Sequence, residues 1–115
     1  MFRALITLLM ACATLFVHTV AQAETTPKQK AVLVTGASSG LGRATAETLA
    51  AKGYFVYAGA RKDADLTELD AIENIQAVRL DVTQQDQIDA AVKTIREAGR
   101  GLYGLVNNAG VAVLS

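Results

Sequence analysis

The feature that most constrains the fold of this chain is an alternation of short apolar runs with helical stretches from Ala31 onward. Ala31–Val34 is a continuous apolar run, which is typical of a strand buried on both faces of a sheet. A glycine-rich turn follows, and a helical pattern then extends from about Leu41 to Lys52. Gly53 stands where a helix takes a left-handed terminal residue. The sequence therefore predicts a strand, a tight turn and a helix in direct succession.

The same alternation continues along the chain. Aromatic and β-branched residues predict a second strand, and a third and a fourth strand are separated from it by helical stretches. Thr83 is the expected cap of the last helix, which Gly99 and Gly101 end. The predicted segments are the strand Tyr54–Ala58, a short weak helix at Leu66–Ala71, the strand Gln76–Leu80, a helix containing Ile88, Ala91, Val92 and Ile95, and the strand Leu102–Val106.

Strands and helices that alternate in this way imply parallel strands joined by helical crossovers. The predicted fold class is therefore α/β, a Rossmann-type doubly wound parallel sheet. We expect the sheet to be incomplete, with about four strands in the order 3-2-1-4.

Residues 1–23 have the pattern of a secretory signal peptide. Arg3 gives a positive start, an apolar run extends from Ala4 to Val20, and small residues end the segment just before Glu24. We expect cleavage there and export to the periplasm or the exterior. Residues 24–30 are polar and are predicted to form a linker.

Two alternatives to cleavage stay open. Residues 4–20 are nearly long enough to span a bilayer, so the segment could be a membrane anchor with the domain in the cytoplasm. A lipoprotein acylated at Cys12 is a weaker alternative, because the sequence after Cys12 stays apolar.

Removal of residues 1–23 limits the kinds of active site that residues 24–115 can form. Cys12 and His18 are the only Cys and His, so residues 24–115 contain neither. This excludes zinc sites built on His and Cys, and also a Ser-His-Asp triad. All 11 acidic residues remain and Arg3 is lost from the 11 basic ones, which leaves a formal charge of −1. Residues 24–115 have no basic stripe of the kind that binds nucleic acid.

The stretch Thr35–Gly42, TGASSGLG, lies between the first strand and the first helix. Gly36 suits a tight turn, Gly40 lets the backbone approach a pyrophosphate, and Gly42 allows close helix packing. The helix start presents free N–H groups to an anion. On spacing alone, a purely structural glycine turn remains an alternative, since the pattern is not G-x-G-x-x-G. A P-loop is excluded because no Lys-Ser or Lys-Thr follows the last glycine.

Three ordered motifs make the sequence resemble the short-chain dehydrogenases/reductases over residues 31–115. They are TGASSGLG, Asp81-Val82 after the third strand, and Asn107-Asn108-Ala109-Gly110 after the fourth. The resemblance implies that residues 31–115 are the amino-terminal part of an NAD(P)-binding domain. The implied cofactor-binding residues are Thr35, Gly36, Ser38, Ser39, Gly40, Leu41, Gly42, Arg61, Lys62, Asp81, Val82, Asn108, Ala109 and Gly110.

The resemblance also implies individual roles. Asp81 would accept a hydrogen bond from the adenine amine, with a turn or helix-capping aspartate as the alternative. Asn108 would tie neighbouring strand ends together, while Ala109 and Gly110 are small where the cofactor ribose passes. All lie at the carboxyl ends of strands, where open α/β sheets bind ligands.

The end of the second strand indicates the choice of cofactor. A carboxylate there would hold the ribose 2′-hydroxyl of NAD, but the sequence has Ala60, Arg61 and Lys62. Cations suit a 2′-phosphate, so we expect NADP, with NAD as the alternative and a solvated basic pair as the non-functional explanation. The missing carboxylate also counts against an S-adenosylmethionine-dependent methyltransferase.

The resemblance implies hydride transfer between NADP(H) and a small-molecule carbonyl/alcohol pair. The segment Gly101–Val106 is similar to the retinol- and hydroxysteroid-oxidising branch of the family, some members of which have amino-terminal anchors. The catalytic Ser and Tyr-x-x-x-Lys of the family are missing, since Tyr54, Tyr57 and Tyr103 have no Lys four residues later. All three tyrosines are interpreted as strand residues.

We therefore expect a fragment or truncated product that holds the cofactor-binding part and no catalytic residue. The alternatives are a non-catalytic dinucleotide-binding module and a non-functional product. Because the fourth strand would be an exposed edge, homo-oligomers are also expected.

Overall fold

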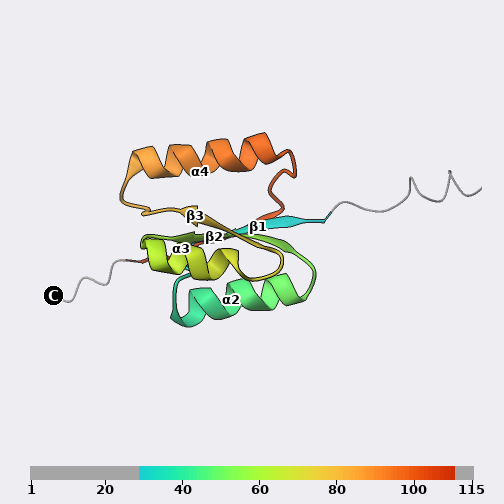
Figure 1. Ribbon diagram of the computed structural model, residues 1–115. Coiled ribbons are helices and arrows are strands. Elements are labelled where there is room, and N and C mark those ends of the chain that lie inside the picture. Colours follow the sequence, from blue (N-terminus) through green and yellow to red (C-terminus); the bar gives the residue numbers. More distant parts are fainter. Residues whose placement is uncertain (1–28, 111–115) are drawn as a thin grey trace, which may run out of the picture.

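The computed structural model describes residues 29–110. In this range strands and helices alternate strictly along the chain (Figure 1). The elements are β1 (Ala31–Val34), α2 (Gly40–Ala51), β2 (Phe55–Ala60), α3 (Asp63–Asp70), β3 (Ile75–Arg79), α4 (Gln85–Ala98) and β4 (Gly104–Val106). The predicted signal segment, residues 1–23, lies outside the described residues.

The strands form one parallel sheet in the order β3-β2-β1-β4. Val32 of β1 pairs with Val56 of β2 on one side and with Gly104 of β4 on the other. Figure 1 shows α2 and α3 on one face of the sheet and α4 on the opposite face. The predicted α/β class and the predicted strand order are both confirmed.

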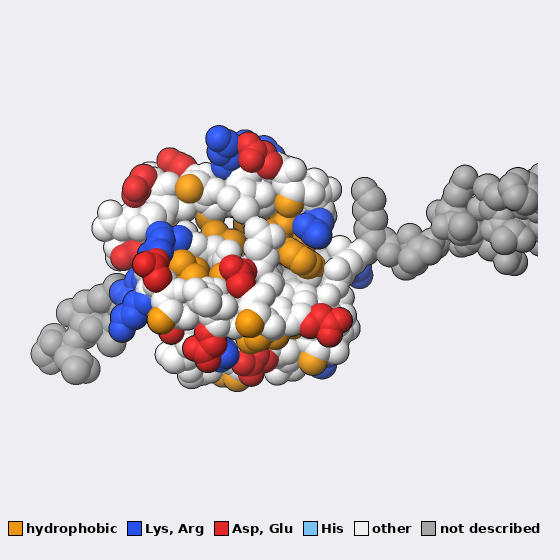
Figure 2. Space-filling view, viewed as in Figure 1, with side chains coloured by type: hydrophobic (Ala, Val, Ile, Leu, Met, Phe, Trp, Pro, Cys, Tyr) orange, Lys and Arg blue, Asp and Glu red, His pale blue; other side chains and the backbone are white. Residues whose placement is uncertain are grey.

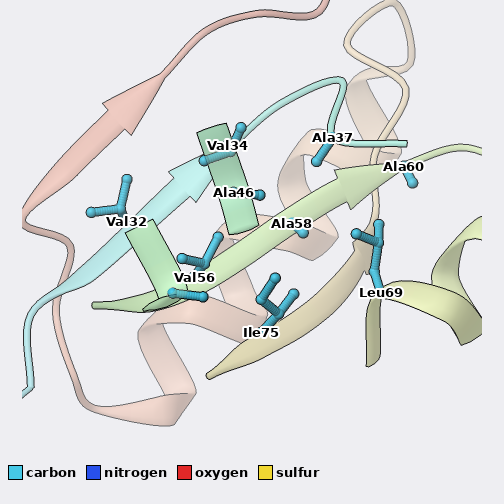
Figure 3. Packing of buried hydrophobic residues seen from close by; sticks show 10 residues of the cluster. Val32, Val34, Ala37, Ala46, Val56, Ala58, Ala60, Leu69 and Ile75 are labelled. Atoms are coloured by element: carbon cyan, nitrogen blue, oxygen red, sulfur yellow. The ribbon is translucent and has the colours of Figure 1, made fainter. Parts of the chain in front are cut away.

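The face covered by α2 and α3 has a continuous apolar core. It is built from small and β-branched side chains, with Val34, Val56 and Leu69 fully buried. Figure 3 shows side chains of the strands directed toward those of α2 and α3. Small residues such as Ala46 let the helix approach the sheet closely, so that the turn before α2 is held rigidly against the strands.

The opposite face has a second core beneath α4. Tyr57 is its largest fully buried side chain, and Ala91 and Ile95 of α4 pack with it. The Tyr57 hydroxyl is buried without a hydrogen-bond partner among the described residues. Leu102 and Leu105 lie exposed beside this core, so α4 covers the face only in part.

Several boundaries differ from the sequence prediction. The fourth strand begins at Gly104 rather than Leu102, and the second begins at Phe55 rather than Tyr54. Tyr54 and Tyr103 therefore precede their strands, and only Tyr57 lies within one. Tyr103 is exposed, and its ring stacks on Tyr54 at 6.3 Å between centroids. The Tyr103 amide still donates to the Ala31 carbonyl at 2.8 Å, so Tyr103 lies at the approach to β4 although it is not part of the strand.

The prediction that Thr83 caps the last helix is wrong. The N-cap of α4 is Gln84, and its side chain makes no capping hydrogen bond. The Thr83 hydroxyl instead donates to the Asp81 carboxylate at 2.6 Å, because an ionised carboxylate is a strong hydrogen-bond acceptor. Between residues 29 and 110, no helix has both the length and the apolar character needed to cross a membrane.

Candidate cofactor-binding site

A cleft of about 310 Å³ opens at the carboxyl end of the sheet. Open α/β sheets bind their ligands at this edge, where the turns after several strands meet. The residues that line it follow all four strands and are Gly36, Ser38, Ser39, Ala60, Arg61, Leu80, Asp81, Val82, Thr83, Asn108, Ala109 and Gly110.

Nine of the predicted site residues are in this lining, and five are not. Thr35 is buried below the cleft, and Gly42 is buried behind Gly36. Gly40 and Leu41 are exposed at the start of α2. Lys62 is the N-cap of α3 and lies outside the lining. Thr83 lines the cleft although it was predicted only as a helix cap. Its spacing of two residues from Asp81 is the sequence signal for the hydrogen bonds that it donates to the Asp81 carboxylate.

The glycines of the turn leave no room for side chains at two of three positions. A Cβ on Gly42 would meet the Gly36 carbonyl oxygen and would lie 2.6 Å from Asn108 Nδ2. A Cβ on Gly36 would lie 3.0 Å from the Ala109 Cα, and Gly36 also has a φ of +60°. Gly40 has a φ of +59°, but nothing lies within 4 Å of its Cβ position. Gly36 and Gly42 are therefore required by packing, whereas the side-chain position of Gly40 faces open space.

The start of α2 differs from that of the other two described helices. The N-caps of all three helices make no side-chain capping hydrogen bond, but the first turn of α2 contains no acidic residue. By contrast, α3 has Asp63 and Asp65 in its first turn, and α4 has Asp86. The N–H groups and the positive dipole end of α2 are therefore left without a negative partner, which is the arrangement that binds an anion.

Thr35 joins the turn after β1 to the segment after β4. Its hydroxyl accepts hydrogen bonds from the backbone N–H groups of Asn108 and Ala109, each at 2.9 Å. It also lies 3.1 Å from Asn107 Oδ1, to which it donates. The Asn108 amide in turn donates to the Gly36 carbonyl at 3.3 Å. These contacts fix two walls of the cleft relative to each other.

Asp81 is held in the turn that follows β3. Its Oδ1 accepts from the Thr83 hydroxyl and from the Thr83 amide at 3.0 Å, and its own amide donates to Gln87 Oε1 at 2.8 Å. The hydroxyl and then the amide of Thr83 hold the pKa of Asp81 below its ordinary value, and the Arg61 cation lowers the pKa further. The side chain is therefore an anionic acceptor in a fixed position, and it also has the turn role given as the alternative.

A second and larger cavity of about 720 Å³ lies between α4 and the sheet. Its lining is mainly apolar and includes Leu33, Ile88, Val92, Leu102 and Leu105. Figure 2 shows hydrophobic side chains between α4 and the strands. Few polar residues line it, and they are Thr35, Arg96 and Asn107, so the smaller polar cleft is the better candidate for a dinucleotide.

Comparisons with known proteins agree with this geometry. The short chain dehydrogenase family profile matches residues 30–115. The mitochondrial D-beta-hydroxybutyrate dehydrogenase of Rattus norvegicus is 39% identical over 93 residues, covering 72% of this chain and 27% of the relative. Retinol dehydrogenase 16 of Homo sapiens is 37% identical over 90 residues, covering 75% of this chain and 28% of the relative.

The similarity extends to solved structures. An actinorhodin polyketide ketoreductase variant crystallised with NADPH superposes with a TM-score of 0.65 at 32% identity, covering 72% of this chain and 34% of that chain. The chain thus spans about a quarter to a third of the length of the proteins it matches.

Proposed function

The chain belongs to the short-chain dehydrogenase family, and on this premise we propose that its cleft binds NADP(H) for hydride transfer between the nicotinamide and a carbonyl/alcohol pair. The observation that carries the proposal is the acid-free start of α2, whose N-cap Ser39 lines a cleft at the carboxyl edge of the sheet. The bound cofactor would supply the hydride chemistry, and the protein would supply position and electrostatics.

The described residues fit the parts of such a cofactor. The backbone N–H groups of Gly40 and Leu41 would hold the diphosphate, and the open space at the Cβ position of Gly40 admits it. Asp81 would accept from the adenine amine, because its carboxylate is fixed and ionised. Ala109 and Gly110 would leave room for the ribose next to them.

The preference for NADP rests on Arg61. This exposed residue follows β2 directly and lines the cleft, where a carboxylate would instead select the 2′-hydroxyl of NAD. A guanidinium forms strong charge-assisted hydrogen bonds with a phosphate. Since Lys62 lies outside the lining, we assign the 2′-phosphate to Arg61 in the first place.

Calorimetric titration of the full chain with NADPH and NADH tests the proposal. We expect NADPH to bind more tightly, and Arg61→Ala to weaken NADPH binding by about tenfold to a hundredfold, as for loss of a charged hydrogen bond. NADH binding should be nearly unchanged. Lys93→Ala is the matched control, since Lys93 is an exposed basic residue in an ion pair on α4. A folded protein that binds neither nucleotide contradicts the proposal.

Turnover is a separate question from binding. A non-catalytic nucleotide-binding module would bind NADPH and oxidise none of it with any carbonyl substrate. Because no Tyr in this sequence has a Lys four residues later, the coding sequence downstream of Ser115 decides between the two. A Tyr-x-x-x-Lys pair encoded there favours the enzyme, and its absence favours the module. A product with no function would neither bind nucleotide nor unfold cooperatively.

We also propose that residues 1–23 direct export, with a membrane anchor as the alternative. The support is the apolar run followed directly by small residues before Glu24. Mass spectrometry of the protein expressed in a bacterium should find Glu24 at the mature amino terminus. An intact amino terminus in the membrane fraction would instead identify an anchor.

A further inference from the structure

The turn that carries Arg61 is short and exposed. Arg61 and Lys62 connect the end of β2 to α3, whose first residue is Asp63. The side chain of Lys62, although it is the N-cap of α3, makes no capping hydrogen bond. The Lys62 carbonyl accepts from the Leu66 amide at 3.1 Å, so α3 holds the middle of the turn, while the contacts at its two ends come from a neighbouring element.

Arg79 supplies those contacts from the last position of β3. Its backbone pairs with Ala60, the residue before Arg61. Its Nη1 donates to the Arg61 carbonyl at 2.7 Å, and its Nη2 forms an ion pair with the Asp63 carboxylate. One guanidinium thus holds both ends of the turn from Arg61 to Asp63.

We infer that Arg79 is a positioning residue for NADP selection, because it fixes the turn from which Arg61 reaches the 2′-phosphate. This inference rests on the proposed use of NADP. The planar fork of a guanidinium can bind a carbonyl and a carboxylate at once, which the single ammonium of a lysine does less well. Arg79 acts through Arg61 and is given no contact with the cofactor.

The exposure of the pair separates this role from a purely stabilising one. The side chains of Arg79 and Asp63 are 47% and 88% exposed, and an ion pair so exposed adds little to folding stability. Its main consequence is therefore local, at the turn.

The balance of charge at this rim makes the position of Arg61 important. Arg61 lies near the Asp81 carboxylate, whose pKa it lowers. An Arg61 released from its turn could pair with Asp81 across the cleft, which would remove a cation from the phosphate site and an acceptor from the adenine site. By holding the Arg61 carbonyl, Arg79 keeps the two charged groups in separate positions.

The test is a double-mutant cycle of Arg61→Ala and Arg79→Ala in the full chain, titrated with NADPH and NADH. We expect Arg79→Ala to weaken NADPH binding by about tenfold, which is about 1.4 kcal/mol, and to change NADH binding by less than about twofold. In the Arg61→Ala background, Arg79→Ala should have almost no further effect. Lys93→Ala again controls for the loss of one exposed paired cation.

Equal weakening of both nucleotides, additive losses in the cycle, or unchanged NADPH binding would each overturn the inference. Failure of the wild-type chain to bind NADPH, or an Arg61→Ala variant with wild-type affinity, would instead overturn the proposed function. If Arg79→Ala does not unfold cooperatively, Arg79→Lys carries the test. It keeps the charge but not the planar fork. It should also weaken NADPH binding and leave NADH binding nearly unchanged, with a smaller loss of NADPH affinity than Arg79→Ala.

Discussion

The buried hydroxyl of Thr35 accepts a hydrogen bond from the backbone N–H of Asn108 at 2.9 Å. The two residues are 73 positions apart in the sequence, yet this contact joins the turn after β1 to the segment after β4. It places the glycine turn and the Asn-Asn-Ala-Gly segment on facing sides of one cleft. The Thr35 hydroxyl and the Asn108 amide, which donates to the Gly36 carbonyl, together hold the two sides in register.

Replacement of Thr35 by valine removes this hydroxyl at nearly constant shape. It leaves the Asn108 and Ala109 amides without their acceptor, and each unsatisfied buried donor costs about 1–3 kcal/mol. For the two amides together, we expect a loss of about 2–6 kcal/mol of unfolding free energy in urea denaturation. Thr35→Ser, which keeps the hydroxyl, should retain most of the stability. Equal losses in both variants would show that the methyl group matters and not the hydrogen bonds.

Gly40 and Gly99 form a matched pair for the phosphate role. Both have a positive φ, +59° and +73°, and nothing lies within 4 Å of either Cβ position. An alanine at either site should cost about 1–2 kcal/mol of stability, because the left-handed conformation is strained. Only Gly40→Ala should weaken NADPH binding, by at least about tenfold, since its methyl group enters the diphosphate position. Equal nucleotide affinities in the two variants would count against this position for the diphosphate.

Thr83→Val should raise the pKa of Asp81. The Thr83 hydroxyl is the largest cause that holds this pKa below the ordinary 3.8. Because the pKa is depressed in the folded state, the ionised carboxylate adds stability above about pH 4, and this stability is lost as the pH falls through the folded-state pKa. The stability difference between wild type and variant should therefore shrink in acid. Carbon-detected NMR titration measures the pKa, and Thr94→Val, whose hydroxyl bonds within α4, is the control.

Leu105 gives the edge strand β4 an exposed apolar side chain. It is 59% exposed on an edge strand and lines the apolar cavity beside α4. Exposed apolar edges favour association, so we expect the chain to form oligomers. Leu105→Lys should raise the monomer fraction in size-exclusion chromatography with light scattering. A wild-type chain that is already monomeric at high concentration would contradict this expectation.

Much of the architecture could be predicted from the sequence, because the patterns concerned are local. The apolar run of β1 and the glycine after α4 depend on near neighbours, and Gly99 does end α4 in the left-handed conformation. The strand order 3-2-1-4 was expected for a Rossmann-type sheet and is confirmed by the structure.

The remaining details depend on contacts between distant residues. Thr83 was predicted as a cap because of its position just before the helix, but its hydroxyl donates a hydrogen bond to the nearby Asp81 carboxylate. Nothing in the sequence indicates that Arg79 holds the Arg61 carbonyl, because that contact forms only when β2 and β3 pair. The boundary of β4 could not be predicted either, since Tyr103 has the propensity of a strand residue and donates to the Ala31 carbonyl, yet the strand begins at Gly104.

The most direct test of the central claim is an NMR titration of the isotopically labelled chain with NADPH. If the amides that open α2 hold the diphosphate, the N–H signals of Ser39, Gly40 and Leu41 should shift strongly and saturably. The signals at the opposite end of the sheet, such as Gly53, should stay in place. A folded chain whose signals at the start of α2 do not respond to NADPH or NADH would contradict the account.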